Sequence, residues 1–123
     1  MCRSVILSLL LCTSVAAHEM TPTYPKWNPS YIEGVHKTTM EMFNTRTDVQ
    51  YYEIGVFDEE WKPIHFVTDY KILKLDYLNH VKFDVYISSK NKDKAEYICS
   101  LSKLKGDNTN KTMVSSKICS RFK

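Results

Sequence analysis

The N-terminal segment of this chain constrains its fold most, because it decides the compartment and therefore the cysteine chemistry. The basic residue Arg3 precedes the apolar run Val5–Leu11, and the segment ends in the small residues Val15-Ala16-Ala17. This order is typical of a cleaved secretory signal peptide. The apolar run is far shorter than the roughly 20 residues that a membrane-spanning helix needs. The sequence therefore predicts a signal peptide over residues 1–17, a secreted, extracellular protein that begins near His18, and no stable membrane insertion.

Cleavage at that point changes the number of cysteines that can pair. Cys2 and Cys12 leave with the signal peptide, so Cys99 and Cys119 are left. An even number of cysteines in an oxidising compartment predicts disulfides. We expect one Cys99–Cys119 bond, which closes a loop of roughly 20 residues and contributes about 3 kcal/mol in the chain-entropy account. A catalytic Cys99 is the alternative, but no nucleophile signature surrounds it.

Size and charge restrict the functional classes. Residues 18–123 are predicted to form a single domain, since domains commonly have roughly 100–200 residues. The full chain has a net charge of +3 and three glycines. That charge is too small to predict nucleic-acid binding, which needs a clustered basic face. No glycine-rich phosphate-binding motif is present, and no set of nucleophile, base and orienting residue can be assembled. We therefore predict neither an enzyme nor a bound cofactor or metal.

One helix is predicted from about Tyr31 to Asn44. Ser30 and Glu33 form a capping-box pattern at its start, in which each side chain satisfies a free backbone N–H. The residues that follow have helical spacing and would give the helix one apolar face. These residues are Ile32, Val35, Thr39, Met42 and Phe43.

Strands are predicted after the helix. Residues 51–56 alternate between apolar and polar side chains, and Val81–Ile87 alternate most clearly. Ile64–Leu75 is a long β-rich run. Glu96–Leu104 and Thr112–Phe122 are further strands, which the disulfide would fasten as a hairpin. Because one helix covers only one face of a sheet, we expect an α+β fold with one long helix on a four- to five-stranded antiparallel sheet.

Five short segments carry a resemblance to a known family: Glu33-Gly34-Val35, Asp84-Val85-Tyr86-Ile87, Cys99-Ser100, Thr112-Met113 and Ser116-Lys117-Ile118-Cys119. Their order and the cysteine spacing resemble the type 2 cystatin superfamily. Cystatins inhibit papain-like cysteine proteases with a wedge made of an N-terminal glycine, a Gln-x-Val-x-Gly turn and a Pro-Trp pair. The resemblance implies a cystatin-like domain, with a papain-like cysteine protease as one candidate partner.

The inhibitory wedge of that family is eroded in this chain. The N-terminal arm has no glycine. The first inhibitory turn falls on Lys74-Leu75-Asp76-Tyr77-Leu78, and the second falls on Leu104-Lys105-Gly106 without the Pro-Trp pair. Asp76 would have to lose its water on insertion into a protease, and Lys105 replaces an aromatic anchor. We therefore expect weak or no inhibition of the standard kind.

A secreted binding protein is the function that these features favour, and a reproductive-tract role is implied by the resemblance alone. The alternatives are a cysteine-protease inhibitor with non-standard contacts and a secreted cationic defence or carrier domain. We expect a monomer or a strand-exchanged dimer, since Ile64–Leu75 could offer an exposed strand edge. Asn110 begins an N-x-[ST] sequon, which either carries a glycan or is unused.

Overall fold

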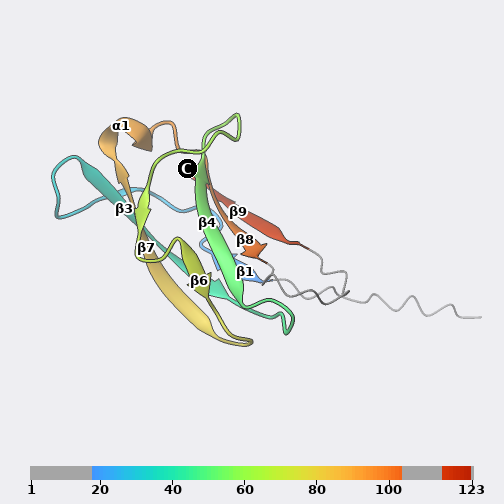
Figure 1. Cartoon of the computed structure of the whole chain (residues 1–123). Coiled ribbons are helices and arrows are strands. Elements are labelled where there is room, and N and C mark those ends of the chain that lie inside the picture. The colour runs from blue at the N-terminus through green and yellow to red at the C-terminus, as the bar shows by residue number, and fades with distance from the viewer. Residues whose placement is uncertain (1–17, 104–114, 123) are drawn as a thin grey trace, which may run out of the picture.

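The computed structural model of this chain describes residues 18–103 and 115–122, which form two stacked antiparallel β-sheets (Figure 1). Sheet A contains β1 (Glu19–Thr21), β2 (Asn28–Pro29), β3 (Val35–Phe43), β5 (Val67–Thr68) and β7 (His80–Ser88). Its strand order is β1-β3-β7-β5, and β2 also pairs with β3. Sheet B contains β4 (Tyr51–Phe57), β6 (Ile72–Lys74), β8 (Tyr97–Lys103) and β9 (Lys117–Arg121). Its order is β6-β4-β8-β9.

The core lies between the two sheets and is filled by alternate side chains of their strands. The predicted alternation in β7 is confirmed, since Phe83, Val85 and Ile87 are buried and the residues between them are more exposed. In β4, Tyr52 and Ile54 face the same core, while their neighbours on the strand face outward. Each sheet therefore has one dry inner face and one outer face that is open to partners.

The helix predicted from Tyr31 to Asn44 is wrong, because this region is a turn followed by β3. The Ser30 hydroxyl, expected to cap a helix, donates instead to the Val35 carbonyl oxygen at 2.7 Å. Gly34 closes the turn with φ +78°, a left-handed conformation that glycine adopts without steric cost. The chain then enters the sheet and not a helix.

The side chains of β3 follow the two-residue period of a strand. Thr38, Met40 and Met42 are buried, and Thr39 between them is exposed. The helical pattern that included Thr39 and Met42 was therefore a coincidence of spacing. The β-branched threonines favour a strand, where they pack well against neighbouring strands.

The predicted α+β fold is therefore wrong. In the described part of the chain, the helical residues form only α1 (Ser89–Lys92), which contains no buried residue. A second sheet, and not a helix, covers the inner face of sheet B. The cystatin-like interpretation is also wrong, because it required a long helix that starts at Glu33-Gly34-Val35. In the structure these residues lead into the strand β3.

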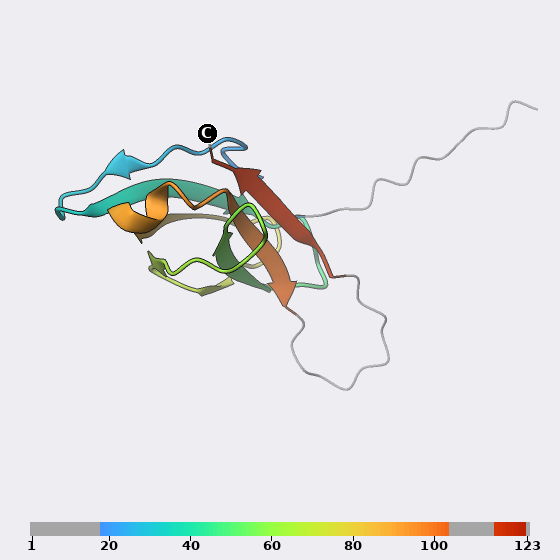
Figure 2. The ribbon, with the colours of Figure 1, turned by 90° about the horizontal axis from the view of Figure 1, so that it is seen from above.

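The segment predicted as one long strand, Ile64–Leu75, is divided between the two sheets. Val67–Thr68 pairs with β7 in sheet A, whereas Ile72–Lys74 pairs with β4 in sheet B. Both edge strands are short, and short edges limit unwanted pairing with other chains. At the opposite edge, the Arg121 N–H donates to the Thr23 carbonyl at 3.1 Å, so the N-terminal arm lies beside β9 (Figure 2).

The predicted disulfide between Cys99 and Cys119 is confirmed, and it joins β8 to β9. The Ser102 N–H donates to the Ser116 carbonyl, so the bonded positions alternate with the cysteine positions. The cysteines thus form a non-hydrogen-bonded pair, in which Cα atoms approach to roughly 4.5 Å. Their Cα–Cα distance of 4.1 Å agrees with this register.

Candidate binding surface

Outward-facing side chains of sheet B and its neighbouring turn form a cluster of rings and cations, which we call the aromatic face: Phe57, Trp61, Tyr97, Lys117 and Arg121. Trp61 and Tyr97 are stacked with their centroids 4.1 Å apart. The Lys117 ammonium lies 4.6 Å from the Trp61 centroid and 4.9 Å from that of Phe57. Cations are attracted to ring faces, so these contacts hold the outer surface in one arrangement.

The turn between β4 and the following segment holds Trp61 in a conformation that bulky residues rarely adopt. Its φ is +64°, in the left-handed region. The Asp58 carboxylate accepts hydrogen bonds from the N–H groups of Glu60 and Lys62, both at 2.9 Å. The Trp61 N–H donates to the Asp58 carbonyl at 3.0 Å. These bonds fix the backbone, while 47% of the tryptophan remains exposed.

Gly55 creates space beneath the aromatic face. A Cβ at this position would lie 2.8 Å from two ring atoms of Phe57, closer than side-chain atoms approach. Gly55 is paired with Cys99 in the neighbouring strand, and the disulfide lies on the same outward side. The absence of a side chain therefore lets the Phe57 ring fold back over β4 and leaves a hollow beside it.

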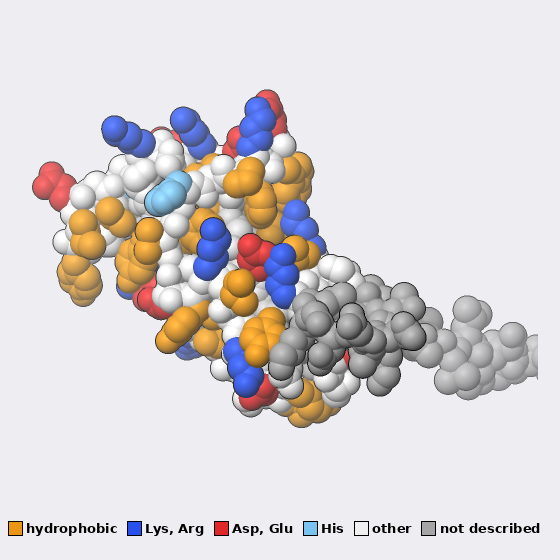
Figure 3. Space-filling view, viewed as in Figure 1, with side chains coloured by type: hydrophobic (Ala, Val, Ile, Leu, Met, Phe, Trp, Pro, Cys, Tyr) orange, Lys and Arg blue, Asp and Glu red, His pale blue; other side chains and the backbone are white. Residues whose placement is uncertain are grey.

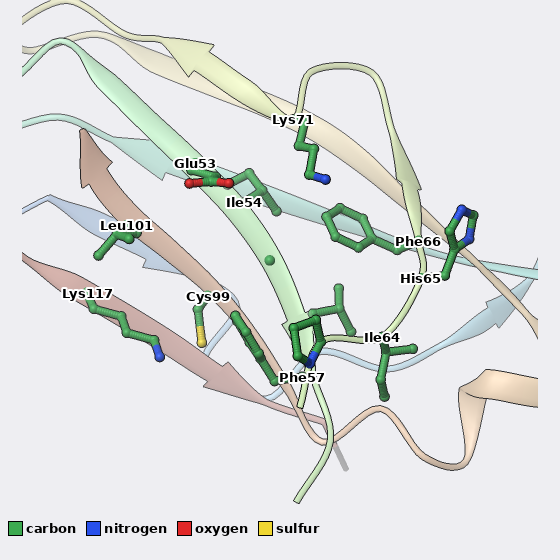
Figure 4. Close-up of a pocket in the computed structure, with 13 residues that line it drawn as sticks. Glu53, Ile54, Phe57, Ile64, His65, Phe66, Lys71, Cys99, Leu101 and Lys117 are labelled. Atoms are coloured by element: carbon green, nitrogen blue, oxygen red, sulfur yellow. The ribbon is translucent and has the colours of Figure 1, made fainter. Parts of the chain in front are cut away.

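A pocket of about 530 Å³ opens at this hollow. Figure 4 shows Phe57 and Cys99 on one side of β4, with Ile64 and Phe66 on the other. Three charged side chains also line it. They are Glu53, Lys71 and Lys117.

The charges of the pocket are not balanced within it. Glu53 is paired with Lys103 at 2.6 Å. Among the ion pairs of the described residues, none involves Lys71 or Lys117. The pocket therefore combines apolar walls with two cations that lack a carboxylate partner. In the view of Figure 3, apolar side chains and Lys or Arg side chains lie interspersed over the molecule.

A second polar cluster lies inside the sandwich, around His18. Its Nε2 lies 2.6 Å from the Ser100 hydroxyl and its Nδ1 lies 3.1 Å from that of Ser116. Burial is the main cause that lowers the pKa of His18 to about 4, and the nearby Arg46 cation acts in the same direction. His18 is 1% exposed and Ser100 is fully buried, so this pair cannot reach a substrate. Its role is to satisfy polar groups in the core.

The same cluster continues through Asn44 and Tyr52. The Tyr52 hydroxyl donates to Asn44 Oδ1 at 2.6 Å, and burial raises the pKa of Tyr52 to about 12. The Asn44 amide donates to the carbonyls of Val49 and Leu75, both at 2.8 Å. These bonds tie the β3–β4 connection to the end of β6, so the cluster stabilises the fold.

Arg46 extends this cluster toward the surface. Its guanidinium contacts the Asp48 carboxylate at 2.6 Å. This hydrogen-bonded pair lowers the pKa of Asp48 and raises that of Arg46. Both groups therefore remain charged at neutral pH.

The residues predicted as the first inhibitory turn lie where β6 leads into β7. Lys74 ends β6, and Leu75 is buried in the core. Leu78 has φ +60°, and its N–H donates to the Asn44 carbonyl at 2.7 Å. Asp76 and Tyr77 complete this turn. The second predicted turn, Leu104-Lys105-Gly106, and the sequon at Asn110 lie outside the described residues, as does the predicted signal peptide.

The described residues contain no group of three or more His, Cys, Asp or Glu side chains that could hold a metal ion. The histidines are dispersed, and His80 instead stacks on Phe43 and approaches Glu41 at 3.4 Å. Over the same part of the chain, no helix is long and apolar enough to cross a membrane.

Sequence reasoning did not find the aromatic face. Asp58, Glu59, Glu60 and Lys62 make residues 58–63 resemble an ordinary solvated turn, although this turn also contains Trp61. The outward positions of β4 and β8 could have given a partial signal, because Phe57 and Tyr97 fall on them. The approach of Lys117 depends on strand pairing across a long sequence separation, and no local pattern reports it.

Comparisons with known proteins support the fold alone. The chain matches no protein-family model, and no curated protein matches it significantly. Among solved structures, it is similar to the crystal structure of the periplasmic chaperone SfaE, with a TM-score of 0.53 and 13% sequence identity. The match covers 86% of this chain but only 56% of the chaperone chain. The chain therefore has an immunoglobulin-like β-sandwich, and the cystatin interpretation is not supported.

Proposed function

We propose that this chain is a secreted protein-binding module that recognises another protein through its aromatic face. Trp61 carries the proposal, because its ring is half exposed and fixed between Tyr97 and Lys117. Tryptophan, tyrosine and arginine provide much of the energy of protein interfaces. A ring that is already ordered loses little entropy on binding.

The backbone of Trp61 strengthens this proposal. A left-handed conformation costs a residue with a Cβ roughly 1–2 kcal/mol, so glycine would be the easier choice at this turn. Strained residues of this kind concentrate at functional sites. An exposed tryptophan at such a position is explained by a need for its ring.

Three further observations support a secreted protein with a protein partner. His18, the first residue of the predicted mature protein, is already part of the buried core. The Cys99–Cys119 disulfide suits an oxidising compartment. The structural neighbour is named as a chaperone, which agrees with binding to proteins. A papain-like protease is no longer proposed as the partner, because that idea depended on the cystatin resemblance.

Position-specific photo-crosslinking tests this proposal. A photoreactive phenylalanine analogue would replace Trp61 in one variant of the mature protein and Tyr31 in a matched variant. Tyr31 is fully exposed and lies in the turn before β3, away from the aromatic face. In the native secretions, we expect a discrete crosslinked protein from position 61 and none from position 31. Equal crosslinking from both positions, or crosslinking from position 31 alone, would contradict the proposal.

A further inference from the structure

We propose that the pocket beside Gly55 binds an extended acidic segment of the partner protein. An Asp or Glu side chain of that segment would lie between Lys71 and Lys117, and an apolar neighbour would pack against Ile64 and Phe66. This inference rests on the proposed function, since it describes the chemistry of the partner that the aromatic face would meet.

Charge complementarity determines the acidic part of the segment. Lys71 and Lys117 approach the pocket from opposite sides of β4 in Figure 4. Glu53, the carboxylate in the lining, already pairs with Lys103 at 2.6 Å. An incoming carboxylate would therefore meet two cations without displacing an existing ion pair. Both lysines are exposed in the free protein, and a segment that covers them against the apolar walls of the pocket would reduce screening by water and salt.

The walls determine the apolar part of the segment. The pocket is lined by aliphatic and aromatic carbon from β4, from the segment 63–66 and from β8. Its volume of about 530 Å³ is large enough for several side chains. Sites of this size are typically apolar with a few polar groups that fix orientation. A residue such as leucine or phenylalanine next to the acidic residue would exclude water from these walls.

The backbone of β4 favours a peptide as the occupant. The Ile54 N–H donates to the Lys71 carbonyl, and the Val56 carbonyl accepts from the Ile64 N–H. The Ile54 carbonyl and the Val56 N–H lie between these two bonds on the same strand edge, where residues 65–70 diverge from β4. Among the backbone hydrogen bonds that the described residues make outside the strand ladders, none involves either group. An extended peptide pairs with a strand edge through its alternating N–H donors and C=O acceptors, which match the free acceptor and donor here.

Selection from a displayed random-peptide library against the mature protein tests the inference. We expect the recovered peptides to contain Asp or Glu next to an apolar residue. A synthetic copy of a recovered peptide should lose at least about tenfold in affinity when its acidic residue is changed to the amide, since a tenfold loss corresponds to about 1.4 kcal/mol. The Lys71→Met and Lys117→Met double variant should lose a similar factor. The same affinity should weaken as salt is raised.

A matched variant separates the pocket from general charge. Lys82 and Lys90 are exposed lysines outside the pocket, so the Lys82→Met and Lys90→Met double variant removes the same charge elsewhere. Its peptide affinity should stay within about twofold of the wild-type value. Equal losses in both double variants would contradict a defined site. Recovery of peptides without acidic residues, or no recovery, would also overturn the inference, as would binding of heparin through Lys71 and Lys117 in place of peptides.

The two proposals can fail separately. Peptides whose binding depends on Trp61 but not on Lys71 and Lys117 would remove the acidic-segment inference and leave the aromatic face as a protein-binding surface. If the photoreactive residue at position 61 gives no more crosslinked protein than the one at position 31, the proposed function is contradicted. The dependence of peptide binding on Trp61 is measured with the Trp61→Gly variant, because glycine readily adopts the left-handed backbone of that turn.

Discussion

At the scale of single residues, Trp61 combines an unfavourable backbone with favourable ring contacts. Its φ of +64° suits glycine, yet its ring stacks on Tyr97 and lies beneath Lys117. The sequence could not reveal this balance, because a tryptophan among charged residues gives no sign of a left-handed backbone. The hydrogen bonds of Asp58 that impose the conformation become visible only in the folded turn.

Two substitutions of Trp61 should separate the backbone cost from the ring contacts. Trp61→Ala and Trp61→Gly both remove the ring, but only glycine relieves the left-handed conformation. We therefore expect the alanine variant to be less stable than the glycine variant by about 1 kcal/mol. Urea unfolding of both variants measures the difference. Equal stabilities would show that the turn relaxes to another backbone conformation when the ring is absent.

His18 should make the stability of the protein depend on pH. Its pKa is about 4 in the folded protein and about 6.5 in an unfolded chain. Above pH 6.5 both states are neutral at this residue. As the pH falls from 6.5 toward 4, His18 becomes protonated in the unfolded state but stays neutral in the folded state. The free energy of unfolding therefore decreases by about 3 kcal/mol.

Denaturant unfolding at a series of pH values measures this decrease. In His18→Gln the corresponding part of the slope should disappear, because glutamine does not titrate. His80→Gln is the matched control, since His80 is 60% exposed and should leave the slope of the buried histidine in place. An unchanged slope in His18→Gln would assign the pH dependence to other groups.

At the scale of elements, β3 shows how two periodicities can compete in one segment. Met42 fits both the helical pattern and the strand pattern, whereas Thr38 and Met40 fit only the strand. The strand prevails because β1 and β7 pair with β3 on both sides. Those partners are distant in sequence, so a local window could not weigh them. By contrast, β7 was predicted correctly because its alternation excludes a helix.

Two substitutions in β3 distinguish the strand from a helix. Met40 is fully buried and Thr39 is exposed. We expect Met40→Ala to reduce the free energy of unfolding by roughly 2–5 kcal/mol, because it leaves a cavity between the sheets. Thr39→Ala should cost less than about 1 kcal/mol, which includes its hydrogen bond to Asp84. Thermal or urea unfolding provides both values, and the reverse order would favour the helical register.

At the scale of the whole molecule, the sequence predicted the strands and the disulfide better than the layers. A disulfide-linked hairpin beside alternating strands occurs in an α+β sheet and in a sandwich alike. The two folds differ in what covers the inner face of the sheet. Here sheet A covers sheet B, and sheet A includes β3, which was predicted as a helix. The segment Ile64–Leu75 contributes one short strand to each sheet. Strand pairing of this kind is not encoded in a local pattern.

The start of the mature protein is the remaining prediction at this scale, and it links the predicted secretion to the fold. His18 fills a buried position between Ser100 and Ser116, and Met20 is buried two residues later. Cleavage beyond His18 would leave the buried Ser100 hydroxyl without its partner, which costs roughly 1–3 kcal/mol, whereas the Ser116 hydroxyl still accepts from the Arg46 guanidinium at 3.3 Å. We therefore expect protein secreted from a cell with a signal peptidase to begin with His18-Glu19-Met20.

N-terminal sequencing or intact mass provides the measurement of this start. A variant that lacks His18 to Met20 should unfold at lower urea concentration than the full mature chain. Retention of residues 1–17 in secreted protein would contradict the signal peptide, whereas a later start with unchanged stability would contradict the role of His18.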